Sequence, residues 1–411
     1  MNSGKMITSN ATAAEDRSRV RAIAFYLPQF HPIPENDEWW GKGFTEWRNV
    51  ARAKPLFKGH YQPHIPADLG FYDLRLPEAR IAQADMATEY GIAGFCYYHY
   101  WFSGKTLLGR PFREVLESGE PDFPFCLCWA NENWTRTWDG EEKQILIKQD
   151  YTLEDDRQHI RSLFRALEDR RYLRISGKPI LLVYRTQHLP NPKQTAEIWR
   201  NEAGKAGIGE LYLVSTESLG ATDPTSIGFD AALEFAPDWY NRGAFMNRNR
   251  NRFYKRLVKY GVVRDVFFEN YVSSYDDLAA AMLAKPIPAY KWFRCVTPSW
   301  DNSARRRSGA SIFTDSTPEK YQGWLEQIIN YAHRVFKHDE KLVFINAWNE
   351  WAEGNHLEPC LKWGRGYLEA TKRVLNQEKR KENRLSVDVN CLSDGTLRDH
   401  REEMVQGSVD I

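Results

Sequence analysis

The stretch GIAGFCYYHY at residues 91–100 decides the fold class, because it is a nearly continuous run of apolar and aromatic side chains. Runs of this length and composition are typical of strands buried on both faces, as in a parallel sheet. The preceding residues, Leu76–Tyr90, repeat apolar side chains at helical spacing, and Gly91 stands where a helix C-cap is expected. A helix that leads directly into a buried strand is the repeating unit of an α/β fold.

Seven further runs of this kind lie along the chain. They are Arg21–Gln29, Phe123–Asn131, Pro179–Arg185, Leu211–Thr216, Ala231–Ala236, Ile287–Val296 and Lys341–Ala347. Helical patterns separate most of them, at Thr152–Arg170, Asn191–Ala206, Phe253–Leu283, Pro318–Phe336 and Gly366–Leu375. This alternation predicts a single (β/α)8 TIM barrel with long βα loops. An open doubly wound sheet is the alternative, but no glycine-rich phosphate loop follows the first run.

The two ends of the chain differ in composition from the barrel. We expect a flexible leader at residues 1–18, one barrel domain at 19–378 and a polar tail at 379–411, because both ends are polar and lack periodicity. The first twenty residues contain no apolar core of a secretory signal. The chain has no apolar run of the roughly 18 residues that a membrane span needs. These features predict a cytoplasmic protein.

Charge and cysteine content exclude several classes of partner. The chain has 56 basic and 55 acidic residues, and its basic runs, including Arg305–Arg307, are not interleaved with stacking aromatic residues. We therefore expect no nucleic-acid partner and interpret these runs as solvated surface. The six cysteines lack metal-type spacing, and Pro63 and Pro66 argue against a helix that would align His60 with His64. Neither a metal nor a cofactor is expected, and the sequence indicates no oligomeric state.

Aromatic residues are unusually frequent, with 15 Trp, 20 Tyr and 21 Phe. Many of the tryptophans stand beside Asn, Asp, Glu or His instead of inside apolar runs. Sugars present apolar C–H faces that stack on indole rings and hydroxyl groups that need polar partners, so this mixture predicts a carbohydrate ligand. Trp39–Trp40 and Glu46–Trp47 lie in the long loop after the first strand, either as a substrate-stacking lid or as a packed loop.

Polar and aromatic residues collect at the carboxyl ends of the predicted strands, where the active site of a barrel forms. We expect Glu350 and Glu353 to be catalytic. The expected substrate-binding residues are Tyr26, Gln29, His31, His99, Trp101, Asn131, Glu132, Trp134, Trp300, Trp348, Asn349 and Trp351. His99 is either a sugar ligand or a histidine of the barrel rim. For Glu132, Glu217 and Glu234, function and scaffolding are equally compatible with the sequence.

The most specific motif is NAWNEWAEGNHLEP at residues 346–359. It resembles the signature NEWHEGTQIEP of the endo-α-mannosidases of glycoside hydrolase family 99. It is more similar still to their relatives with a WbsX-type domain, which occur in bacterial surface-polysaccharide gene clusters and are often labelled glycosyltransferases. The segments AFYLPQFH (24–31), GFTEW (43–47) and WANENW (129–134) fit that second family. The resemblance covers roughly residues 20–375.

The resemblance implies a retaining, endo-α-mannosidase-like hydrolase that acts on a bacterial surface polysaccharide or its intermediate. Its first signature glutamate falls on Glu350, which would assist the sugar's 2-hydroxyl as nucleophile to give a 1,2-anhydro intermediate. Its second falls on Glu353, which would be general acid for the leaving group and then base for water. Two adjacent carboxyl groups also tend to keep one proton near neutral pH. Ala352 replaces a His, and Asn355–His356 replace Thr-Gln, so the sugar is not specified.

Two other functions are compatible with these residues. A glycosyltransferase of lipopolysaccharide or O-antigen synthesis normally needs a diphosphate site, through a glycine-rich turn, a helix N-terminus or an Asp-x-Asp metal motif. The chain contains no Asp-x-Asp motif. A non-catalytic glycan-binding module is favoured if the two glutamates lie far apart or point away from the cleft.

Overall fold

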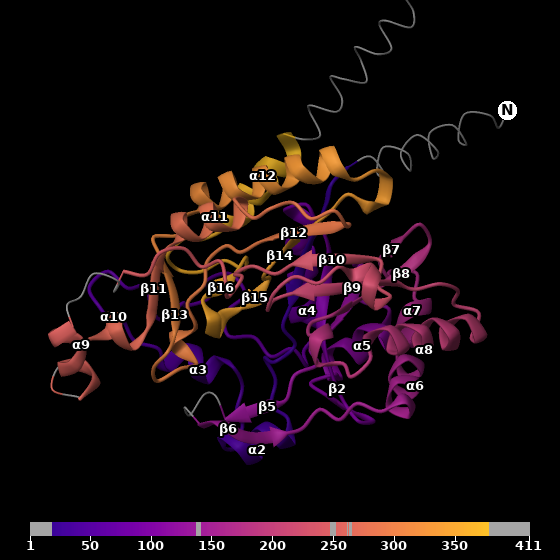
Figure 1. Cartoon of the computed structure of the whole chain (residues 1–411), viewed down its shortest axis with the longest axis horizontal. Helices are drawn as coiled ribbons and strands as arrows, with labels where there is room; N and C mark the ends of the chain where they lie inside the picture. The colour runs from indigo at the N-terminus through magenta and orange to yellow at the C-terminus, as the bar shows by residue number, and fades with distance from the viewer. Residues whose placement is uncertain (1–18, 137–140, 247–251, 261, 263–264, 378–411) are drawn as a thin grey trace, which may run out of the picture.

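A computed structural model of the chain describes residues 19–136, 141–246, 252–260, 262 and 265–377 (Figure 1). Eight parallel strands are hydrogen-bonded in the order β1 (Arg21–Tyr26), β14 (Leu342–Ile345), β12 (Trp292–Val296), β10 (Ala231–Glu234), β9 (Tyr212–Glu217), β8 (Lys178–Val183), β4 (Phe125–Trp129) and β2 (Ile92–Phe102). β2 also pairs with β1, which closes the sheet. The predicted (β/α)8 barrel is confirmed, and each strand overlaps one predicted run. The proposed leader and tail lie outside the described residues.

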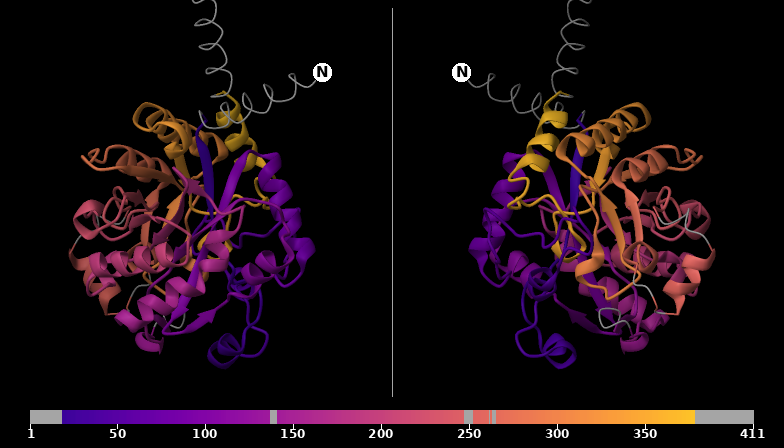
Figure 2. Two further views of the ribbon diagram at one scale, coloured as in Figure 1. Left: turned by 90° about the vertical axis from the view of Figure 1, so that its right-hand side faces the viewer. Right: turned by 90° about the vertical axis from the view of Figure 1, so that its left-hand side faces the viewer.

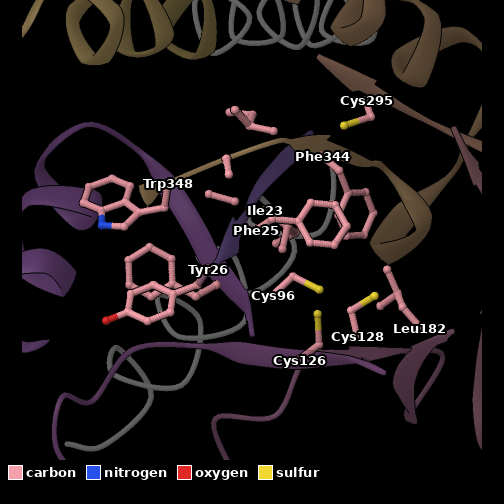
Figure 3. Packing of buried hydrophobic residues seen from close by; sticks show 14 of the residues in the cluster. Ile23, Phe25, Tyr26, Cys96, Cys126, Cys128, Leu182, Cys295, Phe344 and Trp348 are labelled. Carbon is pink, nitrogen blue, oxygen red and sulfur yellow. The ribbon is translucent and has the colours of Figure 1, made fainter. Parts of the chain in front are cut away.

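The barrel interior is filled by apolar side chains from neighbouring strands. Figure 3 shows Phe25 and Phe344 against each other, and the thiols of Cys96, Cys126 and Cys128 gathered nearby. Cys96 on β2 stands opposite Cys126 on β4 in the strand register. The five cysteines that the structure describes are free and buried, as expected, whereas Cys391 lies outside the described residues. Since both faces of each strand are covered, the strands read as apolar runs without polar alternation.

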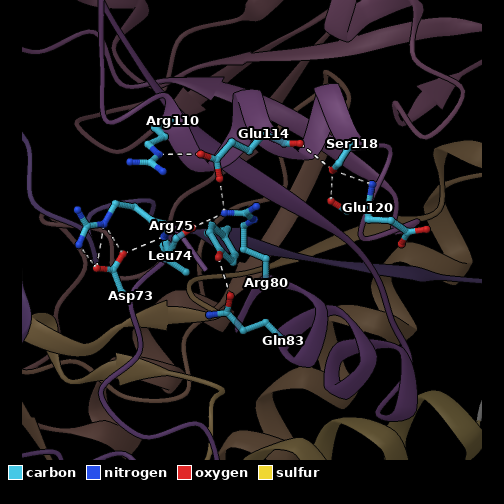
Figure 4. Close-up of polar contacts among 10 residues, drawn as sticks. Asp73, Leu74, Arg75, Arg80, Gln83, Arg110, Glu114, Ser118 and Glu120 are labelled. Atoms are coloured by element: carbon cyan, nitrogen blue, oxygen red, sulfur yellow. Dashed lines mark hydrogen bonds and ion pairs between the residues drawn. The ribbon is translucent and has the colours of Figure 1, made fainter. Parts of the chain in front are cut away.

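Helices surround the barrel strands (Figure 2). They are α4 (Pro77–Glu89), α5 (Arg110–Ser118), α6 (Leu153–Ser162), α7 (Phe164–Glu168), α8 (Pro192–Lys205), α11 (Tyr275–Leu283), α12 (Pro318–Val335) and a last helix at 366–377. Thr152 accepts a hydrogen bond from the Asp155 backbone N–H at 3.0 Å and so caps α6. Arg80 ties α4 to α5, because its guanidinium donates to the Leu74 carbonyl at 2.6 Å and to Glu114 at 2.8 Å (Figure 4).

The predicted helix at Phe253–Leu283 is wrong in its middle. The structure has α9 (Arg252–Lys259), α10 (Val266–Glu269) and then strand β11 (Tyr271–Ser274) before α11. β11 pairs in parallel with β13 (Ser311–Thr314), and the Asn270 side chain accepts a hydrogen bond from the Ala310 backbone N–H at 2.9 Å. This pairing with a distant segment overrides the local helical pattern.

Long βα segments build up the carboxyl end of the barrel. They contain α2 (Pro34–Trp40), α3 (Trp47–Arg52), β3 (Lys105–Leu107), the hairpin of β5 (Trp134–Arg136) and β6 (Glu141–Ile147), β11 with β13, and the pair β15 (Asn349–Glu350) and β16 (Asn355–His356). At the opposite end, β7 (Arg174–Ile175) precedes β8. Figure 1 shows the β5–β6 hairpin beside α2, where the Trp39 and Trp134 rings are in contact. Among the described helices, none combines the length and the apolar composition needed to cross a membrane.

Candidate active site

A cleft of about 600 Å³ opens at the carboxyl end of the barrel. Its walls come from residues at or after the ends of β1, β2, β4, β8, β10, β12 and β14, together with α2 and β11. Active sites of this fold form at that end, because the βα loops converge there. Glu350 and Glu353 both line the cleft.

The two glutamates are held by a short, rigid turn after β14. Glu350 ends β15, which pairs with β16, and Glu353 ends the 3-10 turn Trp351–Glu353. Gly354 follows with φ +56°, and a Cβ there would lie 3.1 Å from Asp301 Cβ and 3.1 Å from His64 Nε2. A side chain at this left-handed position would be strained and would crowd Asp301 and His64, so glycine is favoured here. The backbone N–H of Asp301 donates to the Glu353 carbonyl at 2.6 Å, so the β12 loop fixes the turn from outside.

Asn349 aligns the loops after β1 and β14. Its Oδ1 accepts from the Leu27 backbone N–H at 2.7 Å, and its Nδ2 donates to the Leu27 carbonyl at 3.0 Å. The side chain therefore replaces a strand partner at the barrel rim and does not line the cleft. These contacts favour a structural role for Asn349 beside Glu350 over its predicted role as a sugar ligand.

Arg305 joins the carboxyl groups of the site. Its guanidinium lies 3.0 Å from Glu350 Oε2, 2.8 Å from Glu353 Oε1 and 2.8 Å from Glu46 Oε2. The side chain of Arg305 is only 13% exposed, and that of Glu46 is fully buried. The interpretation of Arg305–Arg307 as solvated surface is therefore wrong for Arg305. The sequence of three consecutive arginines does not reveal that carboxylates distant in the chain contact Arg305 in the folded protein.

Burial dominates the acid–base properties of the pair. The pKa of Glu350 is raised to about 8 by burial, and also by the negative charges of Glu353 and Glu46, although Arg305 lowers it. Burial and Glu46 likewise raise the pKa of Glu353. Three neighbouring carboxylates raise the pKa of Arg305 despite its burial, so the guanidinium stays cationic. The raised pKa values of both carboxyl groups favour one proton shared between them near neutral pH.

Aromatic side chains form much of the cleft wall. Of the expected substrate-binding residues, Gln29, Glu132, Trp134 and Trp300 line it. It is also lined by aromatic residues absent from that set: Trp40, Tyr98, Tyr100, Tyr184, Phe235, Trp239 and Tyr271. Trp300 packs edge-on against Trp239, with ring centroids 5.3 Å apart. Such rings offer flat apolar faces that match sugar rings.

Strand alternation explains which residues of β2 reach the cleft. Tyr98 and Tyr100 line it, whereas the intervening His99 and the following Trp101 point to the helix layer. His99 Nε2 lies 3.1 Å from His159 Nε2, and Trp101 Nε1 donates to Asp155 Oδ1 at 2.9 Å. Successive side chains of a strand point to opposite faces, so a cluster at a strand end always divides in two. The expectation that His99 and Trp101 bind sugar is corrected accordingly.

Other expected ligands also lie outside the cleft, in structural positions. Tyr26 donates to Gln83 of α4 at 2.7 Å, and Asn131 accepts from the Arg185 backbone N–H at 2.8 Å. Trp351 stacks on the His356 ring at 3.7 Å and donates to Glu358 at 2.6 Å. The remaining two, His31 and Trp348, are buried, at 1% and 0% exposure. Proximity in sequence to Glu350 and Glu353 does not place a side chain in the cleft.

The three other strand-end glutamates have distinct surroundings. Glu132 lines the cleft and accepts from Arg185 Nε at 2.7 Å. Glu217 accepts from the Trp292 indole at 2.8 Å, and burial raises its pKa. Glu234 is buried against Arg294 and lies 3.4 Å from Lys285 Nζ. Glu217 and Glu234 are not among the cleft-lining residues, so their contacts favour scaffolding, whereas Glu132 retains access to a ligand.

Replacement of Trp348 should therefore test stability instead of binding. Trp348 is fully buried against Phe95, with ring centroids 5.2 Å apart. We expect Trp348→Ala to lower the free energy of unfolding by about 3–5 kcal/mol, the usual cost of deleting a buried aromatic ring. Trp134→Ala is the control: it should cost less stability and instead weaken glycan binding. Urea unfolding followed by circular dichroism measures the free energy of unfolding of both variants. An equal loss of stability in Trp134→Ala and Trp348→Ala would place Trp134 in the core.

A family model described as Glycosyltransferase WbsX matches residues 22–371, which span the whole barrel. The chain belongs to this WbsX family. Two relatives from strains of Xanthomonas campestris pv. campestris, each described as "Uncharacterized protein WxcX", are 44% identical over 371 residues and 45% identical over 355 residues. These alignments cover 90% and 86% of this chain but 52% and 49% of the relatives, so the chain spans about half their length.

Solved structures share the barrel of this WbsX-family chain. The GH99 endo-alpha-mannosidase from Bacteroides thetaiotaomicron aligns with a TM-score of 0.52 and 14% identity, over 88% of this chain and 98% of that one. A "Glycoside hydrolase-like protein" aligns with a TM-score of 0.51 and 15% identity, over 87% and 94% of the two chains. At these identities the similarity establishes the fold. Family and fold together support a carbohydrate-related enzyme. The expected membership of the WbsX family is confirmed, and the similarity to the GH99 structure is one of fold.

Proposed function

We propose that this chain is a retaining glycoside hydrolase, endo-α-mannosidase-like in mechanism, that cleaves a bacterial surface polysaccharide or an intermediate of its synthesis. The observation that carries the proposal is the shared guanidinium of Arg305, which holds Glu350 and Glu353 side by side in one aromatic cleft. Glycosidic bonds are cleaved by two carboxyl groups, one of which must hold a proton. Burial and neighbouring negative charges raise the pKa of both carboxyl groups, which favours a proton held by the pair near neutral pH.

The proposed reaction has two steps. Glu350 accepts the proton of the sugar's 2-hydroxyl while O2 attacks the anomeric carbon, and Glu353 protonates the oxygen that leaves. Glu353 then removes a proton from water, which opens the anhydro ring, and Glu350 returns its proton to O2. Two inversions at the anomeric carbon give net retention. The first step requires that the proton shared by the pair resides on Glu353, so that Glu350 is ionised. We infer that a substrate 2-hydroxyl donating to Glu350 stabilises this ionised form.

Two alternatives remain for the same cleft. The description of the family favours a glycosyltransferase, in which a sugar hydroxyl replaces water as acceptor. In a non-catalytic glycan-binding module the two glutamates would transfer no proton and would only contact the bound glycan. Incubation with activated aryl glycosides, and separately with nucleotide sugars, distinguishes these functions. Release of the aryl group supports the hydrolase, transfer from the nucleotide sugar alone supports the transferase, and binding without turnover supports the module.

The pH profile should report the shared proton. We expect kcat/KM to fall as pH rises through about 8, because the pKa of Glu350 is raised to about 8 and above this pH the carboxyl pair no longer holds the proton that Glu353 must donate. Glu46→Gln removes a negative charge that raises the pKa of both catalytic groups. The alkaline limb should then move to lower pH, by roughly one unit. Glu197→Gln, on the exposed face of α8, is the control and should leave the limb in place. If the alkaline limb of the Glu46→Gln profile stays at the wild-type pH, a different group controls it.

A further inference from the structure

A strongly basic groove adjoins the cleft. Its volume is about 430 Å³, and six cationic side chains line it: Arg48, Arg52, Lys54, Arg305, Arg306 and Arg307. No acidic residue is among its lining residues within the part of the chain that the structure describes. The cations come from two segments far apart in sequence, the α3 region and the loop after β12. In a chain of net charge +1, this local excess of one sign is a specific feature of the fold.

Most of this charge is not neutralised by the protein. Considering the described residues alone, Arg48, Arg52, Lys54 and Arg307 make no ion pair, and all four side chains are exposed. Within the described part of the chain, the only side-chain hydrogen bond of these four residues is that of Arg48, whose guanidinium donates to the Trp40 carbonyl at 2.6 Å. Like charges held together in this way repel one another, and a bound anion relieves the repulsion.

The groove and the cleft lie side by side and share part of their walls. Trp40, Arg305 and Arg306 line both. Arg305 contacts Glu350 and Glu353 directly, so a ligand in the groove reaches the neighbourhood of the reacting bond. Trp39 and Phe44 add an aromatic wall on the groove side. A substrate that occupies both spaces would place its sugar in the cleft and an anionic group among the arginines.

We propose that this groove binds a diphosphate group carried by the glycan substrate. Arginine guanidinium groups match phosphate oxygens through paired hydrogen bonds, and a diphosphate offers several charges and many acceptors. A single carboxylate would compensate only one of the cations. The assignment rests on the proposed function and deepens it, because it names a diphosphate-linked glycan as the substrate class. The diphosphate can come from a nucleotide or from a lipid carrier, and both have the chemistry that the groove recognises.

Calorimetric titration with inorganic pyrophosphate tests the groove. We compare the wild type with the double variant Arg52→Ser/Arg307→Ser. A matched control, Arg113→Ser/Arg334→Ser, removes two exposed arginines of α5 and α12 that do not line the groove. The groove variant should bind at least about tenfold more weakly, the scale of a lost charge-assisted contact, while the control stays within about twofold. Thermal melting of both variants checks that the fold is retained.

Further probes separate the sources of the anion. Stronger binding of uridine diphosphate than of pyrophosphate would identify a nucleotide carrier, and stronger binding of geranyl diphosphate a lipid carrier; either supports the proposal. Absence of pyrophosphate binding, equal weakening in the two double variants, or preference for glucuronate over pyrophosphate would overturn it. The titration requires no turnover, so its failure leaves the proposed hydrolysis standing. Loss of hydrolysis in the catalytic variants, conversely, does not depend on the groove.

Discussion

Glu350→Gln is expected to lower kcat by about 10³-fold or more on every glycoside that the enzyme cleaves, the upper range for loss of a general base. The proposed intermediate cannot form unless the 2-hydroxyl loses its proton, whatever the leaving group. Gln keeps the size of the side chain and removes its capacity to accept a proton. The fold should survive, because the backbone pairing of β15 with β16 and the Asn349 contacts with Leu27 do not involve the carboxyl group.

The 2-hydroxyl itself provides the control for Glu350. An activated aryl glycoside without this hydroxyl should not be turned over by the wild type. If the 2-deoxy compound is cleaved well while Glu350 is intact, the carboxylate acts as a direct nucleophile, and the ordinary two-carboxylate retaining scheme replaces the proposed one. Glu217→Gln, which alters a glutamate outside the cleft lining, should change catalysis far less than Glu350→Gln.

Glu353→Gln should separate substrates by their leaving groups. Activity on the natural glycan should fall by about 10²–10⁴-fold, because the leaving oxygen is then not protonated. An activated aryl glycoside needs little proton transfer, so its first step should be nearly preserved. Its second step should slow, since Glu353 also activates water. Steady-state kinetics with aryl leaving groups of graded acidity measure this effect as a steeper dependence of rate on leaving-group pKa.

Two results would count against that role. A uniform loss across all leaving groups would mean that Glu353 only supports the geometry of the site. A similar pattern in Arg305→Lys, which keeps the positive charge but not the fork that contacts Glu46, Glu350 and Glu353, would shift the effect from proton donation to positioning. We expect Arg305→Lys instead to lower activity on activated and natural substrates alike.

The barrel was predictable from the sequence because its strands are buried on both faces. Continuous apolar runs such as residues 91–100 have few other interpretations once helices separate them. The strand at Tyr271–Ser274 could not be read in this way, because it is stabilised by β13, a partner about 40 residues away. Local sequence patterns do not predict strand pairings with distant segments.

The site was predictable only in part. The motif at residues 346–359 located Glu350 and Glu353. Whether each of the other candidate residues lines the cleft depends on the direction of its side chain, which the motifs do not specify. Period-two alternation along β2 could have separated Tyr98 and Tyr100, which line the cleft, from His99, which does not. The convergence of Glu46 and Arg305 left no local signal, because the two residues are far apart in sequence and meet only in the folded barrel.

The central claim is that Glu350 and Glu353 cleave a glycosidic bond with retention of configuration. Proton NMR of the first sugar released from an activated aryl glycoside tests it most directly, since the anomeric signal is read before mutarotation. We expect the product to appear first with the anomeric configuration of the substrate, and Glu350→Gln to abolish its release. Product of inverted configuration, or release that persists in Glu350→Gln, would contradict it.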